Sequence, residues 1–343
     1  MPLRNPLALL TAGLAVATCL TAAGPAQAHT RHACSPDVSI DGFSDALDKT
    51  TYENTYVGNL SALAMDGGGS LAALSDRSSL FRLDARTLKP RSVTPLADEN
   101  GTALDSEGLV IDADGTLLVT SETEPSVRRY SRTGEILDRL PVPDALRVSP
   151  VGRAQPNGTF EGLTLLSGGR TLLASMEYSL SGDDSTIVRF QTWRRTAHGH
   201  FALGAQYAYR KDPGLGVPEV QATPDGRLLV LERGFTSGVG NTVRLYLADP
   251  RGATDTSGIE TLPARPEARL IRKTLLTDLV TCPSLGATAE QPQPNPLLDN
   301  IEGMTITGRT KKTLKVLLAS DDNENKTQTT RFYALRVRTT TQR

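Results

Sequence analysis

The amino-acid sequence predicts an all-β fold, a β-propeller with five to six four-stranded blades. Three observations lead to this prediction: short apolar strands recur in pairs, glycine-containing turns separate them, and acidic residues return at the same two places of each repeat. Four-stranded units that repeat every ~45–60 residues are typical of propeller blades. A β-sandwich or two small β-domains would be less consistent with one pattern that recurs unit after unit.

The clearest repeat begins with Leu109-Val110-Ile111, turns over residues 112–115 and returns as Leu117-Leu118-Val119. An Asp-Gly turn between apolar runs is a strong hairpin signal, because glycine tolerates the positive φ that tight turns require. Similar hairpins begin near residues 63, 163, 220 and 304, and a third alternating strand follows each of them. The early segment 38–57 is expected to pair with the last unit and close the ring, which would remove exposed sheet edges.

The chain begins with the features of a secretory signal peptide over residues 1–28. Arg4 precedes a long apolar stretch, and Ala26-Gln27-Ala28 fits the small-x-small pattern of a cleavage site. We therefore expect a secreted, extracellular protein whose mature chain starts near His29. An uncleaved membrane anchor, or a lipoprotein modified at Cys19, is the alternative, and no later stretch has the roughly 20 apolar residues of a membrane helix.

Loss of the signal peptide would leave two of the three cysteines, Cys34 and Cys282. An even number of cysteines in an oxidising compartment indicates a disulfide, and two unpaired thiols are the alternative. The bridge would tie an N-terminal segment, residues 29–55, to a late part of the propeller domain, residues 56–338.

Acidic residues recur just before the opening strand of a repeat and again at the end of its second strand. The first set is Glu107, Glu161, Glu219 and Glu302, and the second is Asp76, Glu122, Glu177, Glu232, Asp321 and Asp322. Since the opening strand of a blade lines the channel, these side chains are expected to converge on one face. Converging carboxylates need cations, arginines or shared protons, and their oxygens suit Ca²⁺. The alternative is a structural role, with each glutamate accepting hydrogen bonds from backbone N–H groups of the neighbouring blade.

The stretches that carry these acidic residues resemble the phytase-like family, known as "esterase-like activity of phytase". The resemblance rests on 74–77 (Leu-Ser-Asp-Arg), 105–109 (Asp-Ser-Glu-Gly-Leu), 157–163 (Asn-Gly-Thr-Phe-Glu-Gly-Leu), 229–233 (Leu-Val-Leu-Glu-Arg), 300–304 (Asn-Ile-Glu-Gly-Met) and 320–323 (Ser-Asp-Asp-Asn). It implies a propeller that hydrolyses phosphate esters or related esters with metal and carboxylates. The chain departs from the family pattern at Glu324, since an aromatic residue commonly follows the Ser-Asp-Asp-Asn segment.

On this hypothesis, a calcium site and an anion site lie side by side. The expected metal ligands are Glu107, Glu161, Glu302, Asp322 and Asp76; the expected substrate contacts are Arg77 and Arg233. Glu161, Glu107 and Glu302 are the expected catalytic residues, because a glutamate left free of the metal can act as general base. The first repeat has Ser61 in place of the first glutamate, which predicts a site displaced toward Glu107, Glu161 and Glu302.

The expected partner is a small anionic ester or phosphate ester, bound by a monomer. The even balance of 37 basic and 38 acidic residues argues against a nucleic-acid-binding protein. The sequence has no Gly-x-Ser-x-Gly or His-Glu-x-x-His motif, so the common serine and zinc hydrolase signatures are absent. Two alternatives stay open: a lactonase-type sugar hydrolase, and a non-enzymatic binding or scaffold propeller that calcium only stabilises.

Overall fold

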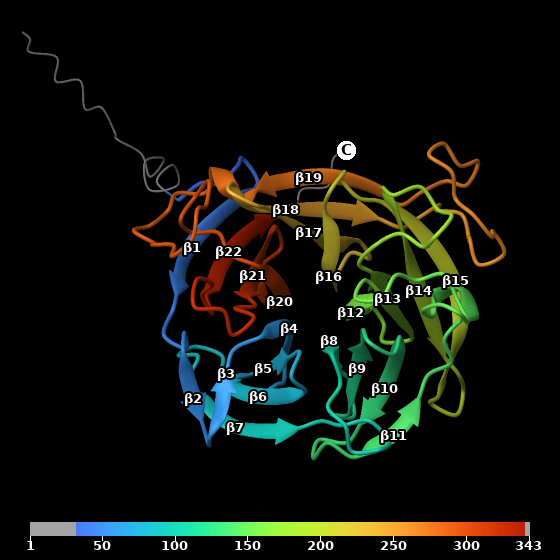
Figure 1. The fold of residues 1–343 in the computed structure, drawn as a ribbon, viewed down its shortest axis with the longest axis horizontal. Coiled ribbons are helices and arrows are strands. Elements are labelled where there is room, and N and C mark those ends of the chain that lie inside the picture. The colour runs from blue at the N-terminus through green and yellow to red at the C-terminus, as the bar shows by residue number, and fades with distance from the viewer. Residues whose placement is uncertain (1–31, 340–343) are drawn as a thin grey trace, which may run out of the picture.

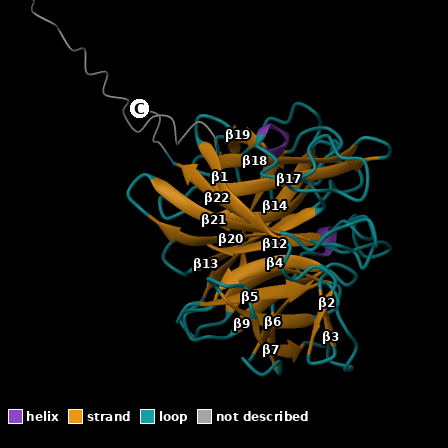
Figure 2. Cartoon of the chain, turned by 90° about the vertical axis from the view of Figure 1, so that its left-hand side faces the viewer, coloured by secondary structure: helices purple, strands orange, loops and turns teal. Residues whose placement is uncertain are grey.

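The computed structural model describes residues 32–339, so the expected signal peptide and Cys19 lie outside the described residues. Five four-stranded antiparallel sheets are arranged as blades around a central axis (Figure 1). This arrangement confirms the predicted all-β propeller and sets the number of blades at five. Helical structure within 32–339 is limited to the single turns Asp144–Leu146 and Leu279–Thr281 (Figure 2). In this range no helix is long and apolar enough to span a membrane.

The first three blades follow the chain from the innermost strand outward. Blade 1 consists of β4 (Leu60–Met65), β5 (Ser70–Ser75), β6 (Ser79–Asp84) and β7 (Pro90–Pro95). Blade 2 consists of β8 (Ser106–Ile111), β9 (Leu117–Ser121), β10 (Ser126–Tyr130) and β11 (Ile136–Arg139). Blade 3 consists of β12 (Phe160–Leu165), β13 (Thr171–Met176), β14 (Ile187–Arg195) and β15 (Phe201–Arg210).

Blades 4 and 5 complete the ring. Blade 4 consists of β16 (Gly216–Ala222), β17 (Leu228–Thr236), β18 (Gly240–Asp249) and β19 (Arg272–Asp278). Blade 5 consists of β20 (Ile301–Arg309), β21 (Thr313–Ser320), β22 (Phe332–Arg338) and, as its outermost strand, β1 (Val38–Ser44). A small separate hairpin, β2 (Thr50–Tyr52) and β3 (Thr55–Val57), leads from β1 into blade 1. The innermost strands β4, β8, β12, β16 and β20 contact one another around the axis.

Strand β1 closes the ring at blade 5. It runs antiparallel to β22, with Ile40 opposite Leu335, so the blue and red ends of the ribbon meet in one sheet (Figure 1). A disulfide joins Cys34, just before β1, to Cys282, which follows β19 of blade 4. This is the predicted pairing, and both cysteines are buried in the apolar cluster between blades 4 and 5.

Apolar side chains fill the spaces between neighbouring blades. Five clusters of buried side chains each join two adjacent blades around the ring. Between blades 2 and 3, the rings of Phe160 and Trp193 meet edge to face with their centroids 5.7 Å apart. Trp193 Nε1 donates a hydrogen bond to Pro141 O at 2.7 Å, which satisfies the polar end of this large buried side chain. Because each blade packs on two others, the innermost strands are held in fixed positions.

Each innermost strand departs from regular pairing near its first residues. The register shifts lie between Leu60 and Ala62, Ser106 and Leu109, Phe160 and Leu163, Gly216 and Glu219, and Ile301 and Gly303. A β-bulge bends the strand and re-aims the side chain at that point. In β8, β12 and β20 the shift spans a Glu-Gly pair, so the irregularity falls on the residues expected to reach the channel.

Replacing both cysteines by serine is expected to lower the free energy of unfolding by about 3–5 kcal/mol, because the bridge restrains residues that lie 248 positions apart in the unfolded chain. Denaturant unfolding followed by the fluorescence of Trp193, the single tryptophan of the chain, measures the loss. The wild-type protein, whose intact mass should increase on reduction, is the control. An unchanged unfolding midpoint in the double variant would contradict this expectation.

Candidate functional site

A cavity of about 530 Å³ opens where the innermost strands begin. Its lining contains eight acidic side chains: Asp76, Asp105, Glu107, Glu122, Glu161, Glu177, Glu302 and Asp321. The cationic side chains among the lining residues are Arg77 and Arg233. With eight carboxyl groups against two guanidinium groups, the fully ionised cavity would have six uncompensated negative charges. Such crowding requires bound protons or cations.

The glutamates meet because the glycine that follows each one lets neighbouring strands approach closely. Glu107 and Glu161 are the second residues of β8 and β12. A Cβ atom on Gly108 would lie 2.4 Å from the carbonyl oxygen of Glu161, and one on Gly162 would lie 2.5 Å from Val220 N. Any larger residue would push the innermost strands apart at these positions. The Glu-Gly pairs therefore serve a close contact between blades and not a turn.

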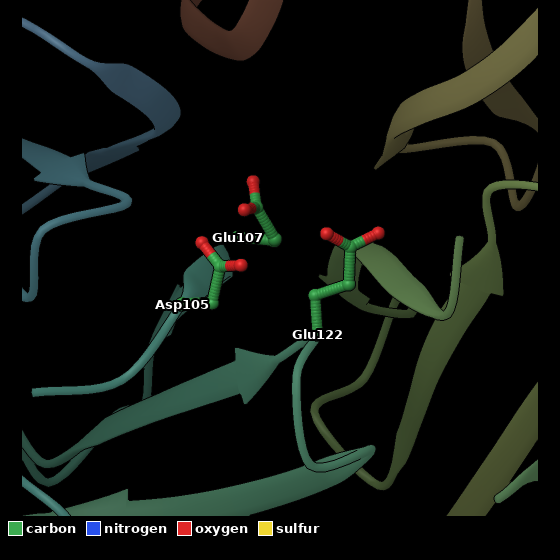
Figure 3. Close-up of side chains that lie close together, drawn as sticks. All are labelled: Asp105, Glu107 and Glu122. Atoms are coloured by element: carbon green, nitrogen blue, oxygen red, sulfur yellow. The ribbon is translucent and has the colours of Figure 1, made fainter. Parts of the chain in front are cut away.

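Five acidic side chains of blades 2 and 3 form two overlapping groups. Asp105, Glu107 and Glu122 each offer an oxygen, and these oxygens lie within 4.8 Å of one another. Glu122, Glu161 and Glu177 form a second such group. Asp105 directly precedes β8, Glu107 is the second residue of β8, and Glu122 follows β9. Their carboxylates point toward a common space (Figure 3). Glu122 belongs to both groups and links the two blades.

The pKa values of these groups show how strongly the site resists negative charge. Burial, followed by the charges of Glu302, Glu122 and other carboxylates, raises the pKa of Glu107 well above its usual value. Burial and the neighbouring Glu107 do the same to the pKa of Glu161. Burial and the charge of Glu177 raise the pKa of Glu122 to about 7. Burial and mutual repulsion therefore both favour the protonated form of these carboxyl groups.

Arg233 lies between the carboxylates of blades 3 and 5. From β17, its NH2 group donates to Glu302 Oε1 and lies 3.5 Å from Glu177 Oε1. Asn300 Nδ2 also donates to Glu302 Oε1, at 3.0 Å. The predicted residues Glu302 and Arg233 are thus brought together as an ion pair, while Glu302 stays outside both three-carboxylate groups.

Asp76 and Arg77 lie at the mouth of the cavity, just after β5. Burial raises the pKa of Asp76 to about 7, and the nearby guanidinium of Arg77 opposes only part of this shift. Arg77 Nε is 3.6 Å from Asp76 Oδ1 and 3.8 Å from Glu324 Oε1. The Arg77 side chain is 66% exposed, so its guanidinium group is accessible to an anion that approaches from solvent.

The structure places Asp322 outside the cavity, whereas the adjacent Asp321 lines it. Asp322 has no exposed side-chain surface, and it accepts hydrogen bonds from Lys49 Nζ at 2.6 Å and from the hydroxyl of Tyr56. Asn59 N donates to its other oxygen at 3.0 Å. Strand β21 ends at Ser320, and in the segment that follows it only Asp321 of the Asp-Asp pair lines the cavity.

In blade 4 the repeated acidic residues have a structural role, which was the alternative to metal binding. Glu219 is buried, and its Oε1 accepts from Val220 N at 2.8 Å and from Leu163 N of blade 3 at 3.3 Å. Glu232 accepts from Lys273 Nζ at 2.6 Å and from the hydroxyl of Tyr209 at 2.7 Å. Both carboxylates hold blades together and do not line the cavity.

Several buried polar atoms of the lining residues have no hydrogen-bond partner within 32–339. They are the acceptors Asp76 Oδ1, Glu122 Oε1 and Glu177 Oε1, the donors Arg233 Nε and Asn241 Nδ2, and the hydroxyl of Ser61. Buried polar atoms are nearly always paired, so these atoms are available to water, an ion or another ligand. The lining contains carboxylates but no histidine or cysteine, which fits a hard divalent cation.

The structure places the predicted residues Glu107, Glu161, Glu302 and Asp76 around one cavity, together with acidic residues that the prediction did not name as site residues. The missed acidic residues are Asp105, Glu122, Glu177 and Asp321. The last three stand at the repeated position after the second strand, so the repeat itself contained the signal. Asp105 has no counterpart in the other repeats, and its position in the loop before β8 became evident only in the folded chain.

The fold and the site together define a class of protein. It is a five-bladed propeller with a buried acidic cavity where the innermost strands begin. The family model of the phytase-like proteins, described as "Esterase-like activity of phytase", matches residues 55–324. The chain belongs to this family, and the predicted resemblance is confirmed. The matched range contains all eight acidic side chains of the cavity.

A curated relative, described as an uncharacterized secreted protein of Arthroderma benhamiae, is 26% identical to this chain. The similarity covers 40% of this chain and 35% of the relative, so the chain spans only about a third of the relative's length. A solved structure of a candidate gluconolactonase covers 80% of this chain and 73% of its own at 14% identity, with a TM-score of 0.42. Virginiamycin B lyase of Staphylococcus aureus covers 82% of each chain at 10% identity, with a TM-score of 0.39. Neither structure indicates the activity of this chain.

The metal-free protein is expected to lose stability as the pH rises from about 4 to about 7. Burial raises the pKa values of Asp76 and Glu122 to about 7 in the folded chain, so the folded state binds more protons than the unfolded state over this range and the stability slope is negative. Thermal unfolding in EDTA at several pH values measures the effect.

Glu122→Gln should reduce this dependence of stability on pH, because it removes one of the carboxyl groups whose pKa is raised. Glu267→Gln, at an exposed position away from the cavity, is the matched control and should leave it intact. Adding Ca²⁺ should offset the loss of stability at neutral pH. A melting temperature that rises steadily from about pH 4 to about pH 7 in EDTA would contradict this electrostatic account.

Asp321→Asn and Asp322→Asn are expected to affect different properties, cation binding and stability, although the two residues are adjacent. Asp321→Asn should weaken cation binding with little loss of stability, because the side chain faces the cavity. Asp322→Asn should lower the free energy of unfolding by about 1–3 kcal/mol, since it weakens the charged hydrogen bonds from Lys49 and Tyr56. Calorimetric titration with Ca²⁺ and denaturant unfolding separate the two effects, and equal effects on both would contradict the assignment.

Proposed function

We propose that this protein is an exported, calcium-dependent hydrolase of small anionic esters, with phosphate esters as the main substrate class. The observation that carries the proposal is the pair of three-carboxylate groups that share Glu122 in a cavity with unpaired oxygens. An arginine with a free buried donor, Arg233 Nε, lies beside them. Cation sites next to an anion donor suit a substrate that bridges the two.

Calcium is the cation that best matches this donor set. It takes six to eight oxygen ligands in flexible geometry, and the cavity offers carboxylates from blades 1, 2, 3 and 5. When bound, Ca²⁺ would neutralise the crowded carboxylates, polarise an ester oxygen and lower the pKa of a water molecule. Asp105, Glu107 and Glu122 would form one set of ligands, and Glu161 and Glu177 would extend it.

The chain's own residues would orient the substrate and accept the proton. Arg233 Nε and the exposed Arg77 would bind the oxyanion of the ester, since guanidinium donors match such oxygens. Glu302 lies outside both three-carboxylate groups and is held by Arg233 and Asn300. Glu302 would therefore accept a proton from the attacking water, since a general base must lie within hydrogen-bond reach of that water.

Export is proposed on three grounds. The first 28 residues have the features of a signal peptide, and the relative from Arthroderma benhamiae is described as secreted. The Cys34–Cys282 disulfide suits an oxidising compartment. The mature protein would act as a monomer on small molecules.

The test is a substrate panel assayed with the full mature chain in Ca²⁺ or EDTA. The panel contains p-nitrophenyl phosphate, bis-p-nitrophenyl phosphate, short acyl esters, phytate and a sugar lactone. We expect turnover of a phosphate ester that EDTA abolishes and Ca²⁺ restores. Glu161→Gln should lower kcat/KM about 100-fold or more, whereas Glu267→Gln should leave it unchanged.

Each other outcome favours a different function. Turnover restricted to the lactone would support a lactonase-type hydrolase instead. If no substrate turns over and Ca²⁺ only raises the melting temperature, the protein is a calcium-stabilised binding or scaffold propeller. Activity that persists in EDTA, or in Glu161→Gln, would refute the proposed mechanism.

A further inference from the structure

The hairpin formed by β17 and β18 reaches beyond the innermost strand of blade 4. The first residue of β16, Gly216, pairs with Arg233, yet the pairing of β17 with β18 continues through Phe235 opposite Asn241 and Thr236 opposite Gly240. Phe235 and Asn241 both line the cavity, as Arg233 does. Alternate residues of a strand share one face, so these three side chains form one surface of the hairpin.

This surface differs chemically from the acidic lining beside it. The unpaired buried atoms of blades 1, 2 and 3 that line the cavity include the acceptors Asp76 Oδ1, Glu122 Oε1 and Glu177 Oε1. Those of the hairpin are donors, Arg233 Nε and Asn241 Nδ2, and Asn241 is only 2% exposed. The cavity therefore offers oxygen ligands for cations from blades 1, 2 and 3, and hydrogen-bond donors for an anion from the adjacent hairpin.

Phe235 is the aromatic side chain among the lining residues. It is 58% exposed, which is unusual for a phenylalanine beside a strongly charged cavity. An exposed ring face next to anion donors suits a ligand in which a ring adjoins an oxyanion. Such a ring can stack on Phe235 while the oxyanion binds the donors.

The hairpin is held in place before any ligand binds. Gly240 has a φ of +111°, and a Cβ atom there would lie 2.4 Å from Gln293 Oε1 and 2.6 Å from Pro292 O. Asn241 N donates to Gln293 Oε1 at 2.8 Å. The loop before blade 5 thus fixes the hairpin against the cavity, and a positioned surface loses less entropy on binding.

We infer that Phe235 and Asn241 determine substrate specificity, by selecting anionic esters whose charged group adjoins a ring with an apolar face. Asn241 Nδ2 and Arg233 Nε bind the oxyanion, and Phe235 stacks on the ring, which is an aryl group or a sugar. The assignment of the ligand as a substrate rests on the proposed function, whereas the binding preference does not.

The experiment compares the affinities of two non-hydrolysable anions, phenylphosphonate and methylphosphonate, by calorimetry in Ca²⁺. Phe235→Ala should lower the affinity for phenylphosphonate about two- to tenfold and leave the affinity for methylphosphonate unchanged. Asn241→Ala should lower the affinity for both ligands, because it removes a hydrogen-bond donor to the phosphonate group that both contain. Phe235→Trp should restore the preference for the ring.

Val239→Ala is the matched control, since Val239 is 56% exposed at the tip of the same hairpin but does not line the cavity. Glucose 6-phosphate, compared in the same variants, distinguishes a sugar from an aryl ring: a Phe235-dependent affinity for it assigns sugar phosphates as well. Equal effects of Phe235→Ala on the two phosphonates, or no effect on either, would overturn the inference.

Two outcomes distinguish the specificity role of Phe235 from the proposed hydrolase activity. Calcium-dependent turnover of p-nitrophenyl phosphate that Phe235→Ala leaves unchanged, in both KM and kcat, supports the hydrolase and overturns the specificity role. Ring-selective, Phe235-dependent binding without turnover of any ester supports the recognition surface and refutes the hydrolase.

Discussion

The fold must hold buried carboxylates closer together than their charges favour, and most other features of the structure serve this constraint. Glu107 and Glu161 come from neighbouring innermost strands, which approach closely because Gly108 leaves no Cβ between them. Apolar clusters between all adjacent blades resist the separation that repulsion would cause. The pairing of β1 with β22 and the Cys34–Cys282 disulfide close the ring. The rigid frame thereby keeps the carboxyl groups crowded, which is why their pKa values are raised.

The repeated acidic residues have different roles in different blades. In blade 4, Glu219 and Glu232 accept hydrogen bonds that join neighbouring blades. In blades 2 and 3, Glu122 and Glu177 keep unpaired oxygens toward the cavity. One repeated acidic position therefore stabilises the fold in some blades and builds a site in others. The same asymmetry leaves blade 4 free to supply donors through its extended hairpin, so that the cavity has two chemically distinct walls.

The N-terminal segment connects ring closure to the cavity rim. After β1 has completed blade 5, Lys49 donates to Asp322 Oδ2 at 2.6 Å, to Asn325 O at 3.0 Å and to Gln328 O at 2.8 Å. Asn325 and Gln328 line the cavity beside Asp321. The loop over residues 321–328 is thus fixed by a lysine far away in the chain.

The sequence by itself determined the fold and the acidic character of the site. Strand pairs with Asp-Gly turns, the recurring Glu-Gly positions and the even cysteine count predicted the propeller, its acidic face and the disulfide, because local patterns specify strands and their repeat. Which carboxylates share a cavity was decided only by the tertiary structure. Asp321 and Asp322 are indistinguishable in the sequence, and their roles depend on which side of the backbone each one faces. Phe235 and Asn241 meet Arg233 only because a hairpin pairs them across its strands and the loop at Gln293 holds that hairpin over the channel.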